Sequence, residues 1–542
     1  MKIQASVWPS VRRLLKGVDK DKEPVMVNLS IFTSRKVAPA ATAVNEAGGR
    51  AYALSDKHAL AQYAATGCLN NTFYTSGQGQ LDAVRALVAK VDAEFVAKTA
   101  VYTRKHSHMK DMPALLLAEL ASRNGEALEK VFGRVCDNGK MLRNFVQIVR
   151  SGATGRRSLG TRPKRLVQRW LDRRTDAQVL ADSVGNDPSL TDVLRMVHPK
   201  PGNDGRRALY GYLLGRQHDA DKLPACVRAF EDFKAGRTEE VPDVPFQLLT
   251  GSPLRESAWR AIAARAGWQM LRMNLNTFLR HGVFDDAALT KALAKKLAAP
   301  DEVRKARVFP YQLLMAYKQA DAAVPKKIRD ALHDAMEAAL DNVPEVEGQI
   351  YVLLDVSGSM HSPATGFRKG ATSAVRCIDV AALVAAAFLR KNRDTTVIPF
   401  HDKVVPCKID GRDSVLTNAQ LLAKLPSGGT NCAAPLQELN RRKAKGDLVI
   451  FVSDNESWID TRSTYRRGTQ VMEEWGEFKR RNSKAQLVCI DVQPGATTQA
   501  PDRKDILNVG GFSDDVFSLI AAFARGGLAG EHWVRAIEAV AL

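Results

Sequence analysis

Hydrophobic residues follow a helical pattern over most of the first 340 positions of the chain. Between about residue 59 and residue 340, apolar side chains recur three and four positions apart, and glycine, proline and asparagine interrupt them. The predicted helical segments are 81–102, 114–121, 140–148, 166–171, 204–214 and 255–279. Successive helices with short polar breaks predict helical hairpins stacked in a solenoid, and a HEAT-like array with degenerate repeats describes them best.

After Pro344 the pattern changes to short β-rich runs that alternate with helical segments. The predicted strands are 350–354, 396–400, 448–452 and 486–491, and the predicted helices are 375–390, 419–425, 436–443 and 471–480. This alternation predicts a parallel sheet that is covered on both faces and binds ligands at the carboxyl ends of its strands. We therefore predict two domains, a mainly α domain over residues 1–345 and a Rossmann-like α/β domain over residues 346–542.

The positive charge of the chain is concentrated in the predicted helical domain. The formal net charge is +20, of which residues 346–542 carry about +3 and residues 1–345 about +17. An excess of this kind points to a polyanionic partner, and nucleic acid is the first candidate because basic side chains that neutralise phosphates release counterions. The alternative is that the charge serves solubility alone. The asymmetry favours a polyanion site in the helical domain.

Cysteine spacing and hydropathy indicate the cellular compartment of the protein. The seven cysteines show no regular spacing and no CxxC motif, so they fit neither a disulfide framework nor a zinc site. The first residues contain no apolar run between basic residues, and no stretch reaches the roughly 20 apolar residues that a membrane span needs. We predict a cytoplasmic protein with reduced thiols, without export and without a membrane partner.

Oxygen-bearing side chains follow several of the predicted strands. Asp355, Ser357 and Ser359 come directly after the strand 350–354, Thr430 lies on a glycine-rich loop, and Asp454 follows the strand 448–452. Carboxylates and hydroxyls are hard donors that suit a divalent cation, Mg²⁺ first of all. The alternative is that the aspartate caps a helix and the serines are turn residues. Three segments at matching strand ends favour the metal site.

Catalytic functions for the same region fit the sequence less well than cation binding does. A phosphatase of the Asp-x-Asp type needs a second carboxylate where Ser357 stands, and neither a Gly-x-Ser-x-Gly elbow nor a GxxxxGK[ST] loop is present. We predict that the protein is not an enzyme. Two rival hypotheses stay open: a metal-dependent protein-binding module, and a metal-dependent nuclease that also uses Asp491.

The densest cluster of basic residues lies at 151–175, which holds eight Lys or Arg against the single acid Asp172. The loop and the start of the following helix contain Arg156, Arg157, Arg162, Lys164 and Arg165. Arg165, Arg169 and Arg173 are four positions apart, so they share one helical face. Arginine forks and backbone amides at a helix start suit phosphate groups. We therefore predict an RNA-binding surface here, with Trp170 in the core.

These segments, together with a turn over residues 194–201 that carries His198 and Lys200, resemble Ro proteins of the TROVE family. The shared elements are a basic stretch from Lys164 to Trp170, the turn, and the motif at Asp355. That motif is similar to the metal-ion-dependent adhesion site of von Willebrand factor A domains. A bacterial Ro orthologue is the closest description of the chain.

The resemblance implies a ring of HEAT-like repeats closed by a von Willebrand factor A domain, in a protein expected to be a monomer. Single-stranded ends of misfolded noncoding RNA would thread the hole, and small noncoding Y RNAs would bind the outer surface. The exoribonuclease polynucleotide phosphorylase would be tethered through Y RNA. An acidic group or water would fill the open position of the cation. The candidate RNA contacts are Lys164, Arg165, Arg169, His198, Lys200, Arg156, Arg157 and Arg162.

Overall fold

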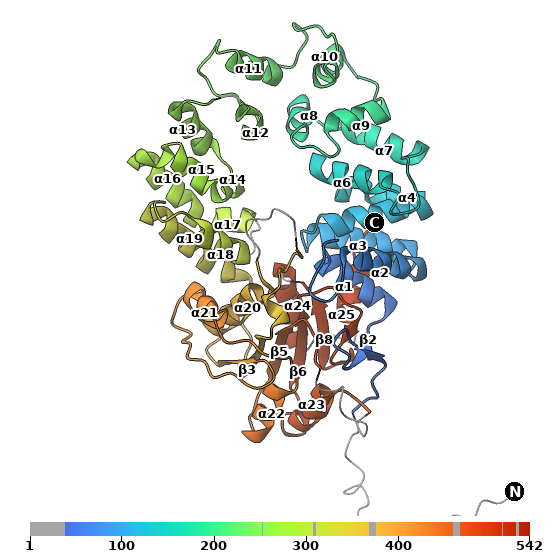
Figure 1. Cartoon of the computed structure of the whole chain (residues 1–542), viewed down its shortest axis with the longest axis vertical. Helices are drawn as coiled ribbons and strands as arrows, with labels where there is room; N and C mark the ends of the chain where they lie inside the picture. The colour runs from blue at the N-terminus through green and yellow to red at the C-terminus, as the bar shows by residue number, and fades with distance from the viewer. Residues whose placement is uncertain are drawn as a thin grey trace, which may run out of the picture. The chain divides into compact units, whose positions relative to one another are not determined.

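Polar residues that cap successive helices divide the first part of the chain. The computed structural model describes residues 38–251, 253–306, 310–367, 375–458, 467–511, 513–526 and 531–542. The side chains of Ser55, Ser76, Asp92, Asn124 and Asn138 each accept a hydrogen bond from an N–H in the first turn of the helix that follows. Such caps satisfy amide groups that have no partner within the helix. Helices, many of them short, therefore follow one another along this region (Figure 1).

The helical region runs from α1 to α19, and its hydrophobic faces form one continuous core. Its helices are α1 (Asp56–Thr66), α2 (Gly77–Lys90), α3 (Ala93–Lys105), α4 (Asp111–Arg123), α5 (Gly125–Val135), α6 (Gly139–Arg150), α7 (Thr161–Asp172), α8 (Asp176–Asp182), α9 (Leu190–Val197), α10 (Asp204–Leu213), α11 (Ala225–Lys234), α12 (Phe246–Leu249), α13 (Glu256–Arg265), α14 (Trp268–Met273), α15 (Leu275–Arg280), α16 (Ala287–Ala298), α17 (Pro300–Ala306), α18 (Pro310–Gln319) and α19 (Lys326–Ala338). No helix in the described ranges is long and apolar enough to cross a bilayer.

Alternate helices contact each other, as in stacked helical pairs. The element α3 contacts α5, α4 contacts α6, α5 contacts α7, and α7 contacts α9. Two predicted helices were wrong in extent. The segment 81–102 is broken because Asp92 caps a new helix through the Phe95 N–H, and the segment 255–279 is three helices separated at Gly267 and Asn274. Apolar periodicity continues across these breaks, so it does not reveal them.

The second part of the chain forms a five-stranded parallel sheet. Its strands are β3 (Ile350–Asp355), β4 (Thr395–Phe400), β5 (Leu448–Ser453), β6 (Gln486–Asp491) and β8 (Ile506–Gly510), in the order β4-β3-β5-β6-β8. Its helices are α20 (Cys377–Lys391), α21 (Val415–Leu422), α22 (Ala434–Arg441), α23 (Gln470–Arg481), α24 (Asp514–Ala524) and α25 (His532–Glu538). The predicted fold class, a helix-rich region followed by a parallel α/β domain, is confirmed. The strand β8 was not predicted.

Helices cover both faces of this sheet. Leu353 and Phe451 pack against α22 and α23 in one buried cluster, whereas Val352 and Leu354 belong to the cluster that continues through α20 into the helical region. In the parallel register Asp355 pairs with Phe400 and Ser453 pairs with Asp491, so β3, β4, β5 and β6 end level with one another. The carboxyl ends of these strands form the edge where the candidate metal residues meet.

Both ends of the helical region are attached to the sheet domain. At the first end, the buried Gln62 of α1 donates a hydrogen bond to the Gln493 carbonyl (2.8 Å), and Lys57 forms an ion pair with Glu538 of α25 (2.6 Å). At the other end, Lys318 of α18 lies 3.1 Å from Asp379 of α20. The described part of the chain therefore closes on itself through its own α/β domain (Figure 1).

A small antiparallel sheet adds a further link between distant parts of the chain. The strands β1 (Ala43–Val44) and β2 (Arg50–Ala53) form a hairpin, and Tyr52 of β2 pairs with Thr498 of β7 (Thr497–Thr498). The hairpin also contacts the loop after β5 closely, because a Cβ atom on the buried Gly49 would overlap the Ser457 carbonyl group. A side chain at this position therefore needs a backbone shift.

We predict that Gly49→Ala lowers the free energy of unfolding by about 1–3 kcal/mol, because overfilling a close-packed contact forces the backbone apart. Gly133 in α5 is the matched control, since a Cβ atom there meets nothing within 4 Å. Gly133→Ala is expected to be neutral or stabilising by up to about 1 kcal/mol, the difference in helix propensity. Denaturant unfolding of the two variants gives both values, and equal effects would contradict the close contact.

Candidate metal centre and nucleic-acid interface

The motif after β3 folds back on the carboxylate that begins it. Asp355 is fully buried, and its Oδ1 accepts a hydrogen bond from the Ser357 N–H (2.8 Å) while its Oδ2 accepts one from the Ser453 hydroxyl (2.6 Å). The hydroxyl oxygens of Ser357 and Ser359 lie 3.2 Å apart. The turn therefore places one carboxylate and two hydroxyls together at the end of the strand.

The other two predicted metal residues lie on loops that join this turn. The loop of Thr430 is tied to it, because the Gly358 N–H donates to the Gly428 carbonyl (3.0 Å). Asp454 follows β5, and its Oδ1 accepts from the Glu456 N–H (3.4 Å), whereas its buried Oδ2 has no hydrogen-bond partner. Thr430 and Asp454 are both almost fully buried. The structure thus gathers the three predicted segments at one edge of the sheet.

Several buried acids make this edge electrostatically unfavourable without a counter-charge. Burial, and then the charge of Asp454, raises the pKa of Asp355 to about 7, and burial also raises the pKa of Asp454. Glu456 and Asp491 lie nearby, and burial raises their pKa values to about 8 and about 7. A buried carboxylate is costly unless it is paired or coordinates a metal.

The residues present fit a divalent cation. The unpartnered Oδ2 of Asp454 provides a free buried oxygen, and the remaining donors are carboxylate and hydroxyl oxygens, which hard cations prefer. Within the described ranges no three residues among His, Cys, Asp and Glu are grouped to hold a metal. A cation here would therefore be held by the mixed set Asp355, Ser357, Ser359, Thr430 and Asp454, with water completing its shell.

The predicted basic segment lines an open pocket at the start of α7. This α7 pocket, of about 700 Å³, contains four cations and no acid among its lining residues, which are Arg150, Arg157, Ser158, Leu159, Gly160, Thr161, Lys164, Arg165, Gln168 and Met196. Arg150, Arg157 and Arg165 are exposed to solvent. Gly160, with a φ of 70°, allows the tight turn that begins the helix. The sequence did not single out Arg150, which comes from the end of α6.

Other arginines of the segment make contacts within the protein. Arg169 forms an ion pair with Glu129 of α5 (2.5 Å), and Arg162 lies over Gly125 at the start of the same helix. The guanidinium of Arg156 donates to the Ala121 carbonyl. These three side chains do not line the α7 pocket, so the predicted ridge of Arg165, Arg169 and Arg173 is divided between two sides of α7.

The turn after α9 lies next to the α7 pocket. His198 caps α9 in a left-handed conformation with a φ of 49°, and both His198 and Lys200 are exposed. The Gln168 side chain donates to the Val197 carbonyl (2.6 Å), which holds this turn against α7. Trp170 is buried and donates to the Cys136 carbonyl (2.5 Å), so it belongs to the core as predicted.

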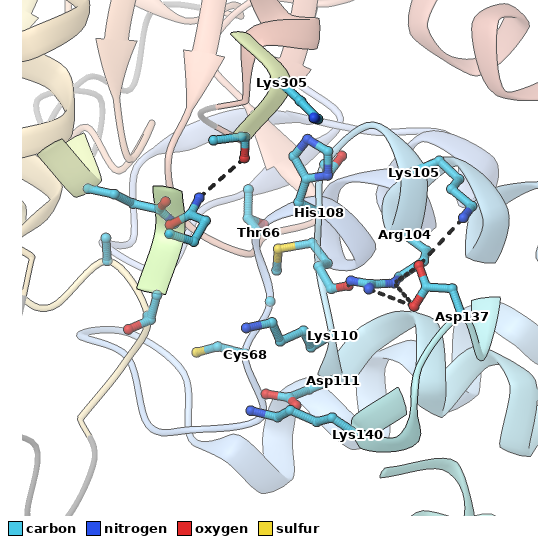
Figure 2. A pocket seen from close by; sticks show the side chains of 18 residues that line it. Thr66, Cys68, Arg104, Lys105, His108, Lys110, Asp111, Asp137, Lys140 and Lys305 are labelled. Atoms are coloured by element: carbon cyan, nitrogen blue, oxygen red, sulfur yellow. Dashed lines mark hydrogen bonds and ion pairs between the residues drawn. The ribbon is translucent and has the colours of Figure 1, made fainter. Parts of the chain in front are cut away.

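A second basic pocket was missed by sequence reasoning. It has a volume of about 560 Å³ and lies between the loops before α2 and α4, the helices α14, α17 and α18, and the segment that follows the metal motif. Its charged residues are Arg104, Lys105, Lys110, Lys140 and Lys305 with the acids Asp111 and Asp137 (Figure 2). These residues come from distant parts of the sequence, and only the run at 104–110 gives a local signal. We call this cavity the junction pocket.

In the junction pocket, one acid is already engaged by two of the cations. Asp137 lies 2.7 Å from Arg104 and 3.5 Å from Lys105, as the dashed lines in Figure 2 show. Figure 2 shows the side chains of Lys110 and Lys140 on the same wall as Asp111. The charge on the lining residues therefore favours an anionic ligand.

A parallel sheet of this order with an Asp-x-Ser-x-Ser turn, a threonine loop and a further aspartate at its carboxyl edge defines a domain of the von Willebrand factor A class. The family model of the Ro60 vWA domain matches residues 349–524. The resemblance of the chain to Ro proteins, predicted from its sequence, is confirmed by this match together with the relatives described next.

One curated Ro protein is similar to most of the chain, and a second is similar to less than half of it. An RNA-binding protein RO60 of Deinococcus radiodurans is 26% identical over 515 residues, which cover 89% of this chain and 95% of that protein. The RNA-binding protein RO60 of Caenorhabditis elegans is 23% identical over 245 residues, or 43% of this chain and 36% of that protein. The crystal structure of the Deinococcus radiodurans RO (RSR) protein has a TM-score of 0.59 at 22% identity and covers 88% of this chain and all of that one, which shows the same fold.

Proposed function

We propose that the protein binds RNA through the α7 pocket and the junction pocket. The observation that carries this proposal is the α7 pocket, whose lining residues include Arg150, Arg157, Lys164 and Arg165 and no acid. Arginine and lysine at the edge of an open pocket suit phosphate oxygens, and the start of α7 adds backbone amides. The relatives in Deinococcus radiodurans and Caenorhabditis elegans carry the name RNA-binding protein, which supports the same class of ligand.

The finer proposal is a ribonucleoprotein component that takes part in RNA quality control. Structured small noncoding RNA of the Y RNA type would bind the α7 pocket, with His198 and Lys200 at its border. Unpaired ends of misfolded RNA would enter the junction pocket, and polynucleotide phosphorylase would join through Y RNA and degrade them. A divalent cation, Mg²⁺ first, would occupy the site at Asp355. The protein itself would then bind and present RNA without cleaving it.

The second candidate function is a metal-dependent protein-binding module, which the buried oxygen cluster at Asp355 and Asp454 favours. An acidic group of a partner would then complete the coordination of the cation. The nuclease hypothesis gains little support, because the Asp491 Oδ1 already accepts a hydrogen bond from the Gln493 N–H (2.9 Å). RNA binding and metal-dependent protein binding, the two candidate functions, make different predictions. Only the first predicts an RNA affinity that depends on the basic pockets.

A salt series on the purified protein tests the proposed function. The RNA is a structured one with a single-stranded 3′ tail. The logarithm of its association constant is expected to fall linearly with the logarithm of the salt concentration, with a slope between about −3 and −6 if four to eight phosphates are contacted. Gel analysis of the same RNA after incubation with Mg²⁺ should show it intact. A salt-independent or undetectable complex would contradict RNA binding, and degradation by the pure protein would favour the nuclease.

A further inference from the structure

Two aromatic side chains beside the junction pocket are exposed to solvent. Phe73 keeps 55% of its surface exposed, and Phe367 keeps 56%. Within the described ranges, the other large hydrophobic side chains with comparable exposure are aliphatic, namely Val44, Met273, Leu421 and Leu542. An aromatic ring in water gains free energy when it packs against a partner, because its apolar surface is then removed from water. A pair of such rings at one place therefore indicates a binding surface.

The two phenylalanines lie on segments that are joined to each other. Phe73 belongs to the loop 68–76 between α1 and α2, and Phe367 ends the segment 362–367 that follows the metal motif. The Phe367 N–H donates a hydrogen bond to the Asn71 carbonyl (2.7 Å), and these two residues form an antiparallel bridge. We call the two joined segments the aromatic rim.

Buried polar contacts hold the backbone of the aromatic rim in place. The fully buried Gln80 accepts from the Cys68 N–H (3.1 Å) and donates to the Asn70 carbonyl (2.7 Å). The Asn70 side chain donates to the Thr365 carbonyl (3.2 Å), and a Cβ atom on Gly366 would overlap this side chain. The rim is thus ordered before any ligand arrives, which lowers the entropy cost of binding.

The ring of Phe73 is restrained by a neighbour without being covered by it. Phe73 and the half-buried Tyr74 meet edge to face, with 4.8 Å between ring centroids and 71° between ring planes. More than half of the Phe73 side chain still contacts solvent. Such a ring is suited to stacking on a flat partner.

The aromatic rim borders the cations of the junction pocket. Cys68 and Thr365 belong to the rim and also line this pocket (Figure 2 labels Cys68). Phe367 is two residues beyond Thr365, so its Cα atom lies within about 7 Å of the pocket wall. The exposed lysines that line the same pocket are Lys105, Lys110, Lys140 and Lys305. Flat apolar groups and positive charges therefore meet at one site.

We propose that the aromatic rim stacks the bases of an unpaired RNA strand whose phosphates lie along the lysines of the junction pocket. This inference rests on the proposed entry of unpaired RNA into that pocket. The bases of a duplex stack on one another, whereas unpaired bases can stack on aromatic side chains. Every base has a π-face, so stacking accepts any sequence. Phe73 and Phe367 thus select for an unpaired strand and not for a particular sequence.

Fluorescence anisotropy of the full chain with two labelled strands tests the proposal. One strand is an unpaired RNA of mixed sequence, and the other has the same length and backbone but lacks its bases. Phe73→Ala is expected to weaken binding of the complete strand roughly 5- to 150-fold, and to change binding of the abasic strand less than about twofold. Leu421→Ala removes an exposed apolar side chain elsewhere, so it should leave both affinities within about twofold.

Two further proteins separate stacking from charge. Phe73→Trp keeps an aromatic face at this position, so it should bind the complete strand within about threefold of the unsubstituted protein or more tightly. The logarithmic salt slope should be unchanged in Phe73→Ala, because no phosphate contact has been removed. Lys110→Ala with Lys140→Ala should instead weaken both strands and make that slope shallower.

The outcomes separate the aromatic rim from RNA binding as such. Equal weakening of both strands by Phe73→Ala, without recovery in Phe73→Trp, would overturn stacking and give Phe73 a structural role in the loop. Unchanged binding of the complete strand by Phe73→Ala would also overturn stacking. In either case a loss in the lysine pair would leave RNA entry into the pocket standing. If the unsubstituted protein binds neither strand, that entry fails and this inference fails with it.

Discussion

A protein that carries Arg157→Ala, Lys164→Ala and Arg165→Ala is expected to bind structured RNA at least about 100-fold more weakly than the unsubstituted protein at about 0.15 M salt. The three side chains belong to the α7 pocket, where no acid lies among the lining residues to offset their charge. Charged hydrogen bonds contribute about 1.5–3 kcal/mol each, and every 1.4 kcal/mol corresponds to a tenfold change in affinity. Filter binding or fluorescence anisotropy measures the loss.

The salt dependence of the triple variant should change together with its affinity. Removing three phosphate contacts is expected to make the logarithmic salt slope shallower by about 2 for single strands and by slightly more for a duplex. Arg173→Ala is the matched control, because Arg173 is exposed at the end of the same helix and does not line the pocket. Its effect on affinity should be less than about threefold.

The result also separates the two basic pockets. If structured RNA is held mainly in the junction pocket, the triple variant will bind it normally, and Lys110→Ala with Lys140→Ala will be the pair that weakens binding. If the α7 pocket holds structured RNA, the junction-pocket pair will mainly reduce binding of an unpaired 3′ tail. The Arg173→Ala control should keep its affinity for both kinds of RNA. If it lost as much affinity for single-stranded tails and for structured RNA as the pocket variants do, a localised site would be contradicted.

The second large effect concerns the cation. Mg²⁺ is expected to stabilise the unsubstituted protein by about 2.7 kcal/mol when its concentration is about 100 times the dissociation constant, because the folded chain alone presents the complete site. Asp355→Asn should abolish this stabilisation, since the substitution removes one of the two buried carboxylates that the cation would offset. Thermal unfolding with Mg²⁺ and with a chelator measures the difference.

Asparagine is the informative substitution at position 355 because it keeps the shape and hydrogen bonds of the turn. Its carbonyl can accept from the Ser357 N–H, and its amide can donate to the Ser453 hydroxyl, which can exchange donor and acceptor roles. In chelator, Asp355→Asn is therefore expected to be at least as stable as the unsubstituted protein, because a buried charge has been removed. Asp413→Asn, at an exposed position in the same domain, should respond to Mg²⁺ normally.

Strong destabilisation of Asp355→Asn in chelator would contradict this account and assign Asp355 a purely structural role in the turn. An unchanged response to Mg²⁺ would place any cation elsewhere in the protein. A third outcome, in which neither protein responds to Mg²⁺, would leave the buried Asp454 Oδ2 without the counter-charge proposed for it.

The sequence predicted four strands of the parallel sheet closely, and it placed the candidate metal residues at the edge where the structure brings them together, because these signals are local. Each predicted strand is a short apolar run, and Asp355 and Asp454 lie within two residues of the ends of two of them. Parallel pairing then places the strand ends together whatever the details of packing. The strand β8 escaped prediction because its sequence ILNVG is short and includes a polar Asn508 that hydrogen bonds within the domain.

The proposed RNA-binding surface was harder to predict, because the charge of a residue does not tell which way its side chain points in the folded chain. Periodicity placed Arg165 and Arg169 on one helical face, but Glu129 of α5 draws Arg169 toward its own side of α7. A basic side chain that forms an ion pair with an acid in the folded chain is less available to a phosphate group than a basic side chain without such a partner. The junction pocket collects residues from both ends of the helical region, so only the folded chain reveals it.

The closure of the chain constrains the order in which it folds during synthesis. The strand β2 pairs with β7, and α1 contacts α25. Segments synthesised among the first 70 residues therefore lack these partners until the residues after 496 have been synthesised. Until then, the edge of the hairpin and the buried face of α1 lack part of their cover, which is the kind of surface that aggregates. The local contacts between successive helices form early, and the final step brings together the two ends of the described chain.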